Sequence, residues 1–351
     1  MINLKRFTKV GIIGFGGYVP KYRLKVEEIA KTYGKNGKQI AMSLGVKQKA
    51  VAGRDEDTVS MAVEAGQRAL IRAGIKASQL GAVLVGSESH PYIVKPTGTI
   101  VGDILGVGNE YICTDLQFAC KAGTTGLIML GGMIEAGLID CGIVIGADKA
   151  QSKPRDVLEY TAGAGAGAII LGNKKYKWWT ALDRIMSFNS DTADFWRREG
   201  QKYPEHAGRF TGEPAYFKQV INCTERYFKK SKEKPADFDQ VIFHMPNGKF
   251  PLRAGKRLGI ERKQMELGFL VPEIGNPYSA SSLLGLIKVL EEARKNEKIL
   301  VVSYGSGAGS DCLSFKMKRK LTKKYKDKGV DLVSQLKKTE DIKYADYLIN
   351  R

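Results

Sequence analysis

The chain has 351 residues, of which 43% are hydrophobic and 26% are charged, the composition of a globular protein with one large or two medium domains. Lys and Arg exceed Asp and Glu by 19 charges, and residues 316–351 alone hold 12 of the basic and 5 of the acidic residues. This charge favours an anionic partner, but it does not choose among nucleic acid, a membrane surface and a phosphorylated small molecule.

Cysteine spacing and hydropathy exclude several classes of protein. The five cysteines are scattered and form no Cys-x-x-Cys pair: Cys113, Cys120, Cys141, Cys223 and Cys312. They fit neither a disulfide framework nor a metal site, so we expect free thiols in a reducing compartment. The apolar run 10–19 is broken by glycines, and no run approaches the roughly 18 apolar residues of a membrane span. We therefore expect a cytoplasmic protein without a metal ion or a membrane anchor.

The N-terminal part of the chain alternates strand and helix patterns. We predict a strand over 10–16, one or two helices over 26–44, an amphipathic helix over 58–73 capped by Asp57 or Thr58, and a buried strand over 82–86. The last strand runs directly into Ser87-Glu88-Ser89. Active sites of layered α/β proteins collect just past the ends of buried strands. Glu88 is therefore a candidate site residue, although most such carboxylates are only solvated.

The stretch from Asp115 to Thr124 is the part of the chain around which we expect the site to be built. It follows a strand predicted over 111–114 and opens an apolar helix predicted over 120–136. The first turn of that helix would expose Cys120 to unpaired backbone N–H groups and to the helix dipole, which favour a thiolate. Cys120 is thus a candidate nucleophile, with an inert buried thiol as the alternative.

The C-terminal part continues the alternation. Strands are predicted over 142–146, 163–171, 240–244, 299–304 and 311–317, helices over 213–230 and 279–295, a polar helical piece ends near Thr161, and 187–213 is predicted to be a long functional loop or lid. A shift of 159 residues superimposes Cys120 on Ser279 and Gly146 on Gly305. This short repeat predicts two similar halves whose central helices face each other and whose loops meet at one site.

Nine ordered pieces of this sequence resemble the thiolase superfamily and, within it, 3-hydroxy-3-methylglutaryl-CoA (HMG-CoA) synthase of the archaeal type. They are Gly86–Ser89, Phe118–Thr124, Gly146–Asp148, Leu158–Gly163, Phe195–Glu199, Gly208–Pro214, His244–Gly248, Gly275–Asn276 and Tyr304–Gly307. The resemblance implies an α/β, thiolase-like fold with two pseudo-symmetric halves in a layered αβαβα core. The implied divisions are 1–175, 176–317 and a basic extension, 318–351, outside the resemblance.

The resemblance also implies roles for individual residues. Cys120 matches the nucleophile that carries an acetyl group, Glu88 the acid/base carboxylate, and His244 an imidazolium that polarises a ketone. A hydrogen-bonded core histidine is the alternative for His244. Four further positions match substrate-binding residues of the family: Thr161, Thr211, Asn276 and Ser306.

Three basic residues match positions beside CoA, namely Arg209, Lys249 and Arg253, although each also fits a solvated basic surface. The stretch 35–37, Lys-Asn-Gly, departs from the family where an acidic residue is expected near substrate. No cofactor is expected beyond the CoA of the substrates.

The implied reaction condenses acetyl-CoA with acetoacetyl-CoA to HMG-CoA, for mevalonate and isoprenoid synthesis. A ketoacyl synthase III-like enzyme also uses Cys, His and Asn, and Glu88 distinguishes the two because decarboxylative condensation needs no base to remove a methyl proton. A non-catalytic basic binding protein for nucleic acid or membranes would explain the tail alone. From the family we also expect a homodimer or larger assembly, and a complex with an acetoacetyl-CoA thiolase and a zinc-containing OB-fold protein.

Overall fold

A nine-stranded sheet organises the computed structural model, which describes residues 4, 6–321 and 331–350. Its order is β11-β12-β13-β8-β1-β7-β6-β4-β5. The bounds are β1 (Gly11–Tyr18), β4 (Ala82–Gly86), β5 (Ile112–Leu116), β6 (Cys141–Lys149), β7 (Ala164–Gly172), β8 (Thr180–Thr192), β11 (Gln240–Phe243), β12 (Lys298–Val302) and β13 (Gly307–Met317).

Helices cover and separate the two halves of this sheet. The longer ones are α3 (Thr58–Ala73), α4 (Thr97–Leu105), α5 (Ala122–Glu135), α6 (Lys218–Ser231) and α10 (Ser281–Glu292). The shorter ones are α1 (Val26–Thr32), α2 (Gly37–Leu44), α7 (Phe250–Arg257), α8 (Arg262–Met265), α9 (Val271–Ile274), α12 (Leu332–Lys337) and α13 (Tyr344–Asn350). Single turns are η1 (Ala77–Gln79), η2 (Val157–Tyr160), η3 (Gly208–Thr211), the π-helical η4 (Gly212–Phe217), η5 (Pro235–Asp237) and η6 (Tyr278–Ala280).

The two halves of the sheet share one pairing pattern. In the first half β4 runs parallel to β6, and β6–β7 and β7–β1 are antiparallel. In the second half β11 runs parallel to β12, and β12–β13 and β13–β8 are antiparallel. A short β1–β8 contact joins the halves. This is the duplicated α/β fold expected from the sequence, and the predicted division at 175/176 falls in the connection between β7 and β8.

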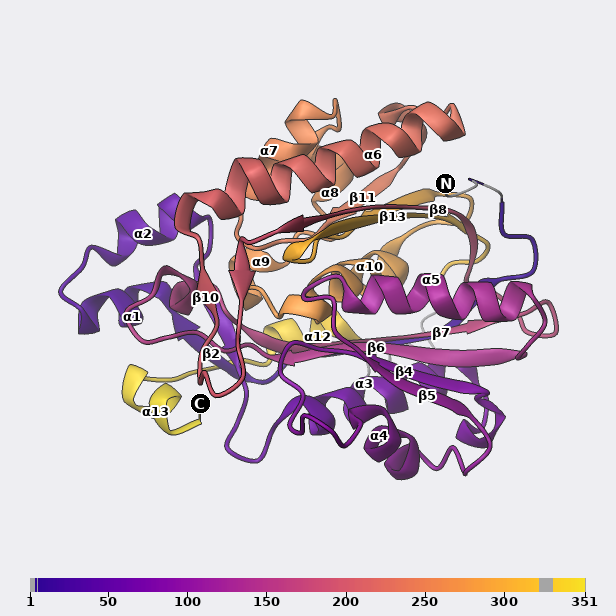
Figure 1. Cartoon of the computed structure of the whole chain (residues 1–351), viewed down its shortest axis with the longest axis horizontal. Coiled ribbons are helices and arrows are strands. Elements are labelled where there is room, and N and C mark those ends of the chain that lie inside the picture. Colours follow the sequence, from indigo (N-terminus) through magenta and orange to yellow (C-terminus); the bar gives the residue numbers. More distant parts are fainter. Residues whose placement is uncertain (1–3, 5, 322–330, 351) are drawn as a thin grey trace.

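Figure 1 shows five layers. Helices α3 and α4 lie below the first half-sheet, α5 and α10 lie between the half-sheets, and α6 and α7 lie above the second half-sheet. Small residues let the central layer approach the sheet closely. A Cβ on Gly146 of β6 would meet the Ser279 carbonyl oxygen at 2.5 Å, so a larger residue there would push the layers apart.

Most predicted elements match the observed ones closely, with a few differences. The helix at 58–73 is capped by Asp57, whose side chain accepts from Ser60 N. Residues 187–192, predicted as loop, extend β8, because their backbone pairs with β13. Helix α4 had not been predicted, since its Thr- and Gly-rich sequence gives a weak helical pattern. The helix predicted from Cys120 begins at Ala122.

The C-terminal tail also differs from the prediction, because part of it is folded onto the body of the protein. In the part that the structure describes, α12 packs on α10 and β1, and β14 (Glu340–Asp341) adds to a small sheet with β2 (Tyr22–Lys25) and β3 (Gln48–Val51). Apolar side chains explain this docking: Leu332 is fully buried, and Tyr344 and Tyr347 are nearly so. Residues 331–350 therefore belong to the folded body. Residues 322–330 of the predicted extension lie outside the described residues.

Candidate active site

Cys120 lies in a tight turn between β5 and α5. Ala119, immediately before it, has φ of 44°, in the left-handed region, and α5 begins two residues after Cys120. On the other side of the turn, a Cβ on Gly305 would meet the Phe118 carbonyl oxygen at 2.5 Å. A strained turn held by close backbone contacts is a common way to present a nucleophile, so the side chain is fixed in direction.

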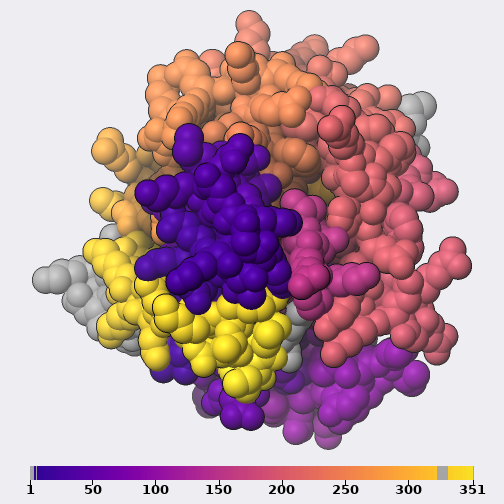
Figure 2. Space-filling view, turned by 90° about the vertical axis from the view of Figure 1, so that its left-hand side faces the viewer, coloured from indigo at the N-terminus to yellow at the C-terminus, as the bar shows by residue number. Residues whose placement is uncertain are grey.

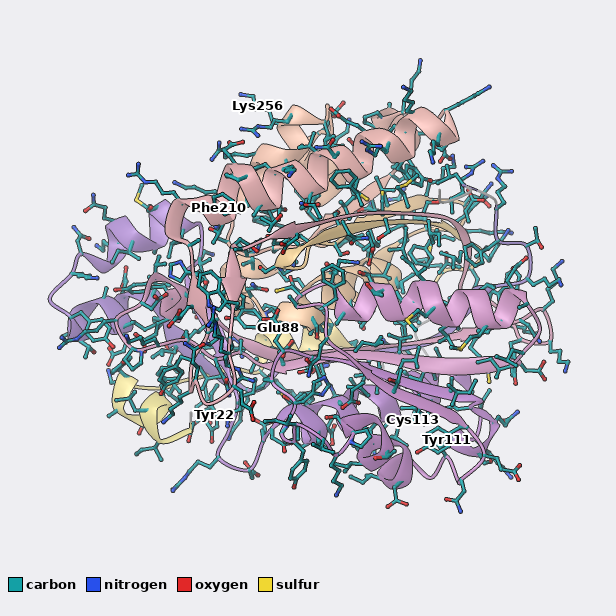
Figure 3. All side chains as sticks on the ribbon, viewed as in Figure 1. Tyr22, Glu88, Tyr111, Cys113, Phe210 and Lys256 are labelled. Atoms are coloured by element: carbon teal, nitrogen blue, oxygen red, sulfur yellow. The ribbon has the colours of Figure 1, made fainter. Side chains whose placement is uncertain are left out.

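Glu88 and Cys120 are in direct contact. Glu88 follows β4, and its Oε1 accepts a hydrogen bond from Cys120 Sγ at 2.9 Å. Figure 3 places Glu88 near the centre of the molecule, between the layers. Cys120 is 6% exposed and packs with Ala162, Tyr278 and the partly buried Phe195. The two predicted site residues, 32 positions apart in sequence, are thus brought together in an apolar environment.

Burial favours a neutral thiol at Cys120, whereas the helix-terminus argument predicts a thiolate. Burial, together with the neighbouring Glu88, raises the pKa of the Cys120 thiol well above its usual range. Burial and then the charge of Asp148 raise the pKa of the Glu88 carboxyl to about 8. Desolvation disfavours both anions, and their proximity allows at most one negative charge on the pair. Ionisation of Cys120 therefore requires a proton acceptor, and Glu88 Oε1 is in position to be one.

Asp148 fixes the backbone at Glu88 by hydrogen bonds. Sequence reasoning did not select Asp148 as a site residue. Its Oδ1 accepts from Ser87 Oγ at 2.8 Å, Glu88 N at 2.8 Å and Ser89 Oγ at 2.7 Å, and its Oδ2 accepts from Ser279 N at 2.8 Å. These bonds tie β4 to β6 and to the start of the α10 region. The signals in the sequence were the position of Asp148 near the end of an apolar strand and its place in the piece Gly146–Asp148 that resembles the family.

His244 directly follows β11, and both of its ring nitrogens lack a hydrogen-bond partner among the described residues. Its backbone is fixed, with N donating to Val302 O and O accepting from Tyr216 Oη, both at 2.8 Å. Burial lowers the pKa of the imidazole to about 3, which favours a neutral ring over the imidazolium that the resemblance implies. A neutral imidazole with free nitrogens can still donate one hydrogen bond to a substrate oxygen.

Asn276 and Thr161, which line the same cavity as Cys120, are held together by a backbone hydrogen bond. Asn276 N donates to Thr161 O at 2.7 Å, and the side-chain Oδ1 of Asn276 accepts from Tyr278 N at 3.0 Å. That second bond orients the amide so that its NH₂ group remains available. Asp194, also missed from the sequence, is buried; it accepts from Gly307 N at 2.9 Å and from Tyr304 Oη. Asp194 thereby fixes the turn that carries Ser306.

A cavity of about 540 Å³ connects these groups to the surface. Its lining includes these predicted site residues: Cys120, Thr161, Arg209, Thr211, His244, Arg253, Asn276 and Ser306. Its outer wall comes from α2, η2, η3, η4 and α7. Figure 2 shows the surface hollowed where the indigo, magenta, salmon and orange segments meet. A cavity of this volume with a mostly apolar lining suits an acyl thioester better than a nucleic acid.

The predicted CoA-binding residues differ in position. Arg209 lines the cavity, and Arg253 does too, but Arg253 Nη2 donates to Glu213 Oε1 at 3.0 Å. Lys249 is exposed at the start of α7 and is not in the lining. Asn36, in the stretch that departs from the family, caps α2 by accepting from Gln39 N at 3.0 Å. The wall from that region is instead provided by Leu44.

Two further searches concern the described residues only. Across residues 6–321 and 331–350, no group of three or more His, Cys, Asp or Glu side chains is arranged to hold a metal ion. Within the same ranges, no helix combines the length and hydropathy needed to cross a membrane.

The raised pKa of Glu88 predicts the pH dependence of the site. If Glu88 acts as a base, it must be ionised, and the folded-state pKa of about 8 places that ionisation above neutral pH. Discharge of an acyl group from Cys120 by an acceptor should therefore speed up as pH rises from about 6.5, reach half its maximum near pH 8 and level off above about 9. Single-turnover rates across this range test it; a rate that is constant or falls with pH would contradict it.

Comparisons with known proteins agree with this fold. Family models for 3-oxoacyl-[acyl-carrier-protein] synthase III match residues 114–190, and for its C-terminal part residues 228–317. Hydroxymethylglutaryl-CoA synthase of Archaeoglobus fulgidus is 52% identical over 308 residues, 88% of this chain and 89% of that protein. The Methanocaldococcus jannaschii enzyme of the same name is 50% identical over 337 residues, 96% of this chain and 97% of that protein. The second match extends into the C-terminal tail, so the tail is not outside the resemblance.

Solved structures share the fold. MvaS in complex with 3-hydroxy-3-methylglutaryl coenzyme A superimposes with a TM-score of 0.87 at 23% identity, covering 99% of this chain and 92% of that one. The 3-oxoacyl-(acyl carrier protein) synthase III, FabH, from Pseudomonas aeruginosa gives 0.82 at 21% identity, covering 90% and 100%. Fold and site together define a condensing acyltransferase of the thiolase-like class. About half of the residues are identical to those of the archaeal relatives over most of the length. The chain therefore belongs to the hydroxymethylglutaryl-CoA synthase family.

Proposed function

We propose that this protein condenses acetyl-CoA, acetoacetyl-CoA and water to 3-hydroxy-3-methylglutaryl-CoA and CoA, with Cys120 carrying the acetyl group. The observation that carries the proposal is the 2.9 Å contact between Cys120 Sγ and Glu88 Oε1, beside a cavity that His244 and Asn276 also line. A nucleophile and a base in contact, next to free hydrogen-bond donors, are the parts that acyl transfer and enolisation need.

The first half-reaction transfers the acetyl group. The Cys120 thiol gives its proton to Glu88 as Sγ attacks the thioester carbon of acetyl-CoA. The tetrahedral oxyanion is stabilised by hydrogen-bond donors lining the cavity. The C–S bond to CoA then breaks, and CoA leaves as the thiol, taking the proton from Glu88. The products are acetyl-Cys120 and an ionised Glu88.

The second half-reaction forms the carbon–carbon bond. Glu88 removes a proton from the acetyl methyl group, and the resulting enolate carbon attacks the ketone carbon of acetoacetyl-CoA. Neutral His244 donates a hydrogen bond to the developing alkoxide, which finally receives the proton held by Glu88. Water then cleaves the thioester at Cys120, which gives the free carboxylic acid of the product and restores the thiol.

A ketoacyl synthase III-like reaction is the second candidate, favoured by the two family-model matches. Decarboxylation of a malonyl group generates the enolate in that reaction, so a base against the nucleophile is not required. The Glu88–Cys120 contact therefore supports the first candidate. The test is to supply the acetylated protein with acetoacetyl-CoA or with malonyl-carrier protein and to identify the products. Formation of HMG-CoA supports the proposal, and discharge by the malonyl substrate alone contradicts it.

Arg209 is proposed to bind a CoA phosphate, and Arg253 more weakly, since Glu213 already neutralises part of the charge of Arg253. Arg209→Ala should raise KM for acetyl-CoA about tenfold with kcat little changed, because one charge-assisted contact to phosphate is lost. Arg253→Ala should raise KM by less. Steady-state kinetics on both variants measure this, with Lys256→Ala, exposed on α7 and outside the cavity lining, as a surface-charge control. Equal effects for Arg209 and Lys256 would contradict the assignment.

The same proposal covers the setting of the reaction. We propose that CoA enters only as part of the substrates, that the product feeds mevalonate and isoprenoid synthesis in the cytoplasm, and that the enzyme is at least a homodimer. We also propose, from the family resemblance, that the enzyme forms a complex with an acetoacetyl-CoA thiolase and a zinc-containing OB-fold protein. On this proposal, part of the basic charge of the protein serves to bind the phosphates of CoA, and no nucleic-acid partner is needed to explain it.

A further inference from the structure

The end of the chain lies against the back of a loop that lines the active-site cavity. Strand β14 pairs with β2, with Glu340 N donating to Lys21 O at 3.0 Å and Ile342 N to Arg23 O at 2.9 Å. Helix α13 follows and turns two tyrosines, Tyr344 and Tyr347, into the protein. Figure 2 shows this yellow segment packed directly beside the indigo α1–α2 region. The segment thus reaches the wall of the cavity from outside.

Glu159 of η2 receives the hydroxyl group of Tyr344. Its buried carboxylate accepts from Tyr344 Oη at 2.8 Å on Oε1, and from Tyr33 Oη at 3.0 Å and Arg155 N at 2.9 Å on Oε2. The two tyrosine hydroxyls also contact each other. A buried carboxylate that loses one such donor must pay a desolvation penalty or move, so the position of Glu159 depends on Tyr344.

Tyr347 supports the same loop through Lys49. The ammonium Nζ of Lys49, fully buried, lies 4.1 Å from the centroid of the Tyr347 ring and donates to the Glu159 carbonyl oxygen at 2.6 Å. A desolvated cation over an aromatic face is a strong contact. Helix α13 therefore holds both the side chain and the backbone of Glu159.

Residues on both sides of Glu159 lie in the wall of the cavity. Val157 and Leu158 line the cavity, and Thr161 follows. The carbonyl of Thr161 accepts from Asn276 N at 2.7 Å, and Gly163 N donates to Asn276 O at 3.0 Å. A shift of η2 would be transmitted to Asn276 through these bonds, and the cavity wall would move with it.

Resting on the function proposed above, we propose that Tyr344 is a positioning residue for the condensation: through Glu159 it sets the place of Thr161 and Asn276 in the cavity. Tyr344 itself does not line the cavity. The role is confined to α13, because the preceding α12 is anchored elsewhere, with Leu332 N donating to both carboxylate oxygens of Glu291 at 3.0 Å. The contact at Tyr344 can thus be removed while α12 stays attached.

The test compares Tyr344→Phe with Leu348→Ala. The first change removes one hydroxyl and keeps the ring. The second shortens Leu348, whose side chain is 47% exposed on the same helix. Tyr344→Phe should lower kcat about fivefold to tenfold with KM for acetyl-CoA within about twofold, because misplaced groups slow the chemical steps more than binding. Leu348→Ala should leave both constants unchanged.

Hydrogen exchange provides the second measurement, on the resting protein without substrates. In Tyr344→Phe, peptides covering 157–164 and 273–279 should exchange faster than in wild type, while a peptide covering α12 should not. Glu159→Gln, which keeps the shape but weakens the acceptor, should show the same pattern. Faster exchange without a loss of kcat, or a loss of kcat without faster exchange, would overturn the inference, as would equality with Leu348→Ala. Failure of wild type to form HMG-CoA is a separate result that contradicts the proposed function.

Discussion

Cys120→Ala is expected to abolish acetylation by acetyl-CoA and to lower the overall rate by at least about 10⁴-fold, because removal of a covalent nucleophile leaves no alternative route for the acyl group. Intact-protein mass after mixing with acetyl-CoA measures the first effect, and product formation measures the second. The variant should remain folded, since Cys120 packs in a small cluster and Ala119 carries the strain of the turn.

A second thiol supplies the control for that experiment. Cys113 lies on β5, seven residues before Cys120, and does not line the cavity. Cys113→Ala should gain one acetyl group as wild type does. Acetylation that survives in Cys120→Ala but disappears in Cys113→Ala would show that the nucleophile has been misassigned.

Glu88→Gln is expected to separate the two half-reactions. Loss of the proton acceptor should slow acetylation, but the neutral amide also removes the charge that helps to raise the pKa of the Cys120 thiol, so acetyl-enzyme should still form. Removal of the methyl proton, however, loses its base, and condensation should slow by about 10³-fold to 10⁴-fold. Acetyl-enzyme should therefore accumulate and remain after acetoacetyl-CoA is added, as followed by rapid quench and mass measurement.

The charge on Glu88 can be tested separately from its size. Glu88→Asp keeps the carboxylate but withdraws it from Sγ, and should retain more condensation activity than Glu88→Gln. Thiol alkylation as a function of pH reports the Cys120 pKa in each variant. If the Glu88→Gln variant loses the acetyl group on Cys120 to acetoacetyl-CoA at the wild-type rate, Glu88 has no role in the condensation.

Local sequence patterns predicted most of the secondary structure. The helix α3 and the strand β4 have the predicted bounds, because Asp57 provides a cap and five consecutive buried residues leave little choice of element. The proximity of Glu88 and Cys120 could also be anticipated, since each follows the end of a neighbouring parallel strand. The positions of those two residues follow from topology more than from their own chemistry.

Burial and long-range contacts account for what could not be predicted. The ionisation states of Cys120 and His244 depend on desolvation by residues far away in sequence, so a helix-dipole argument gave the wrong sign for the thiol. Asp194 acts through Gly307, 113 positions away. The docking of Tyr344 onto Glu159 spans 185 positions, and a Lys-rich tail gives no local signal of such a contact.

The most direct test of the central claim is the fate of an acetyl group carried by the wild-type protein. The protein is acetylated with acetyl-CoA labelled in the methyl group, freed of excess reagent, and mixed with acetoacetyl-CoA. The account predicts that the label leaves Cys120 and appears in the new branch carbon of 3-hydroxy-3-methylglutaryl-CoA, with the free thiol restored. Label that stays on the protein, or that is released only as acetate, would contradict it.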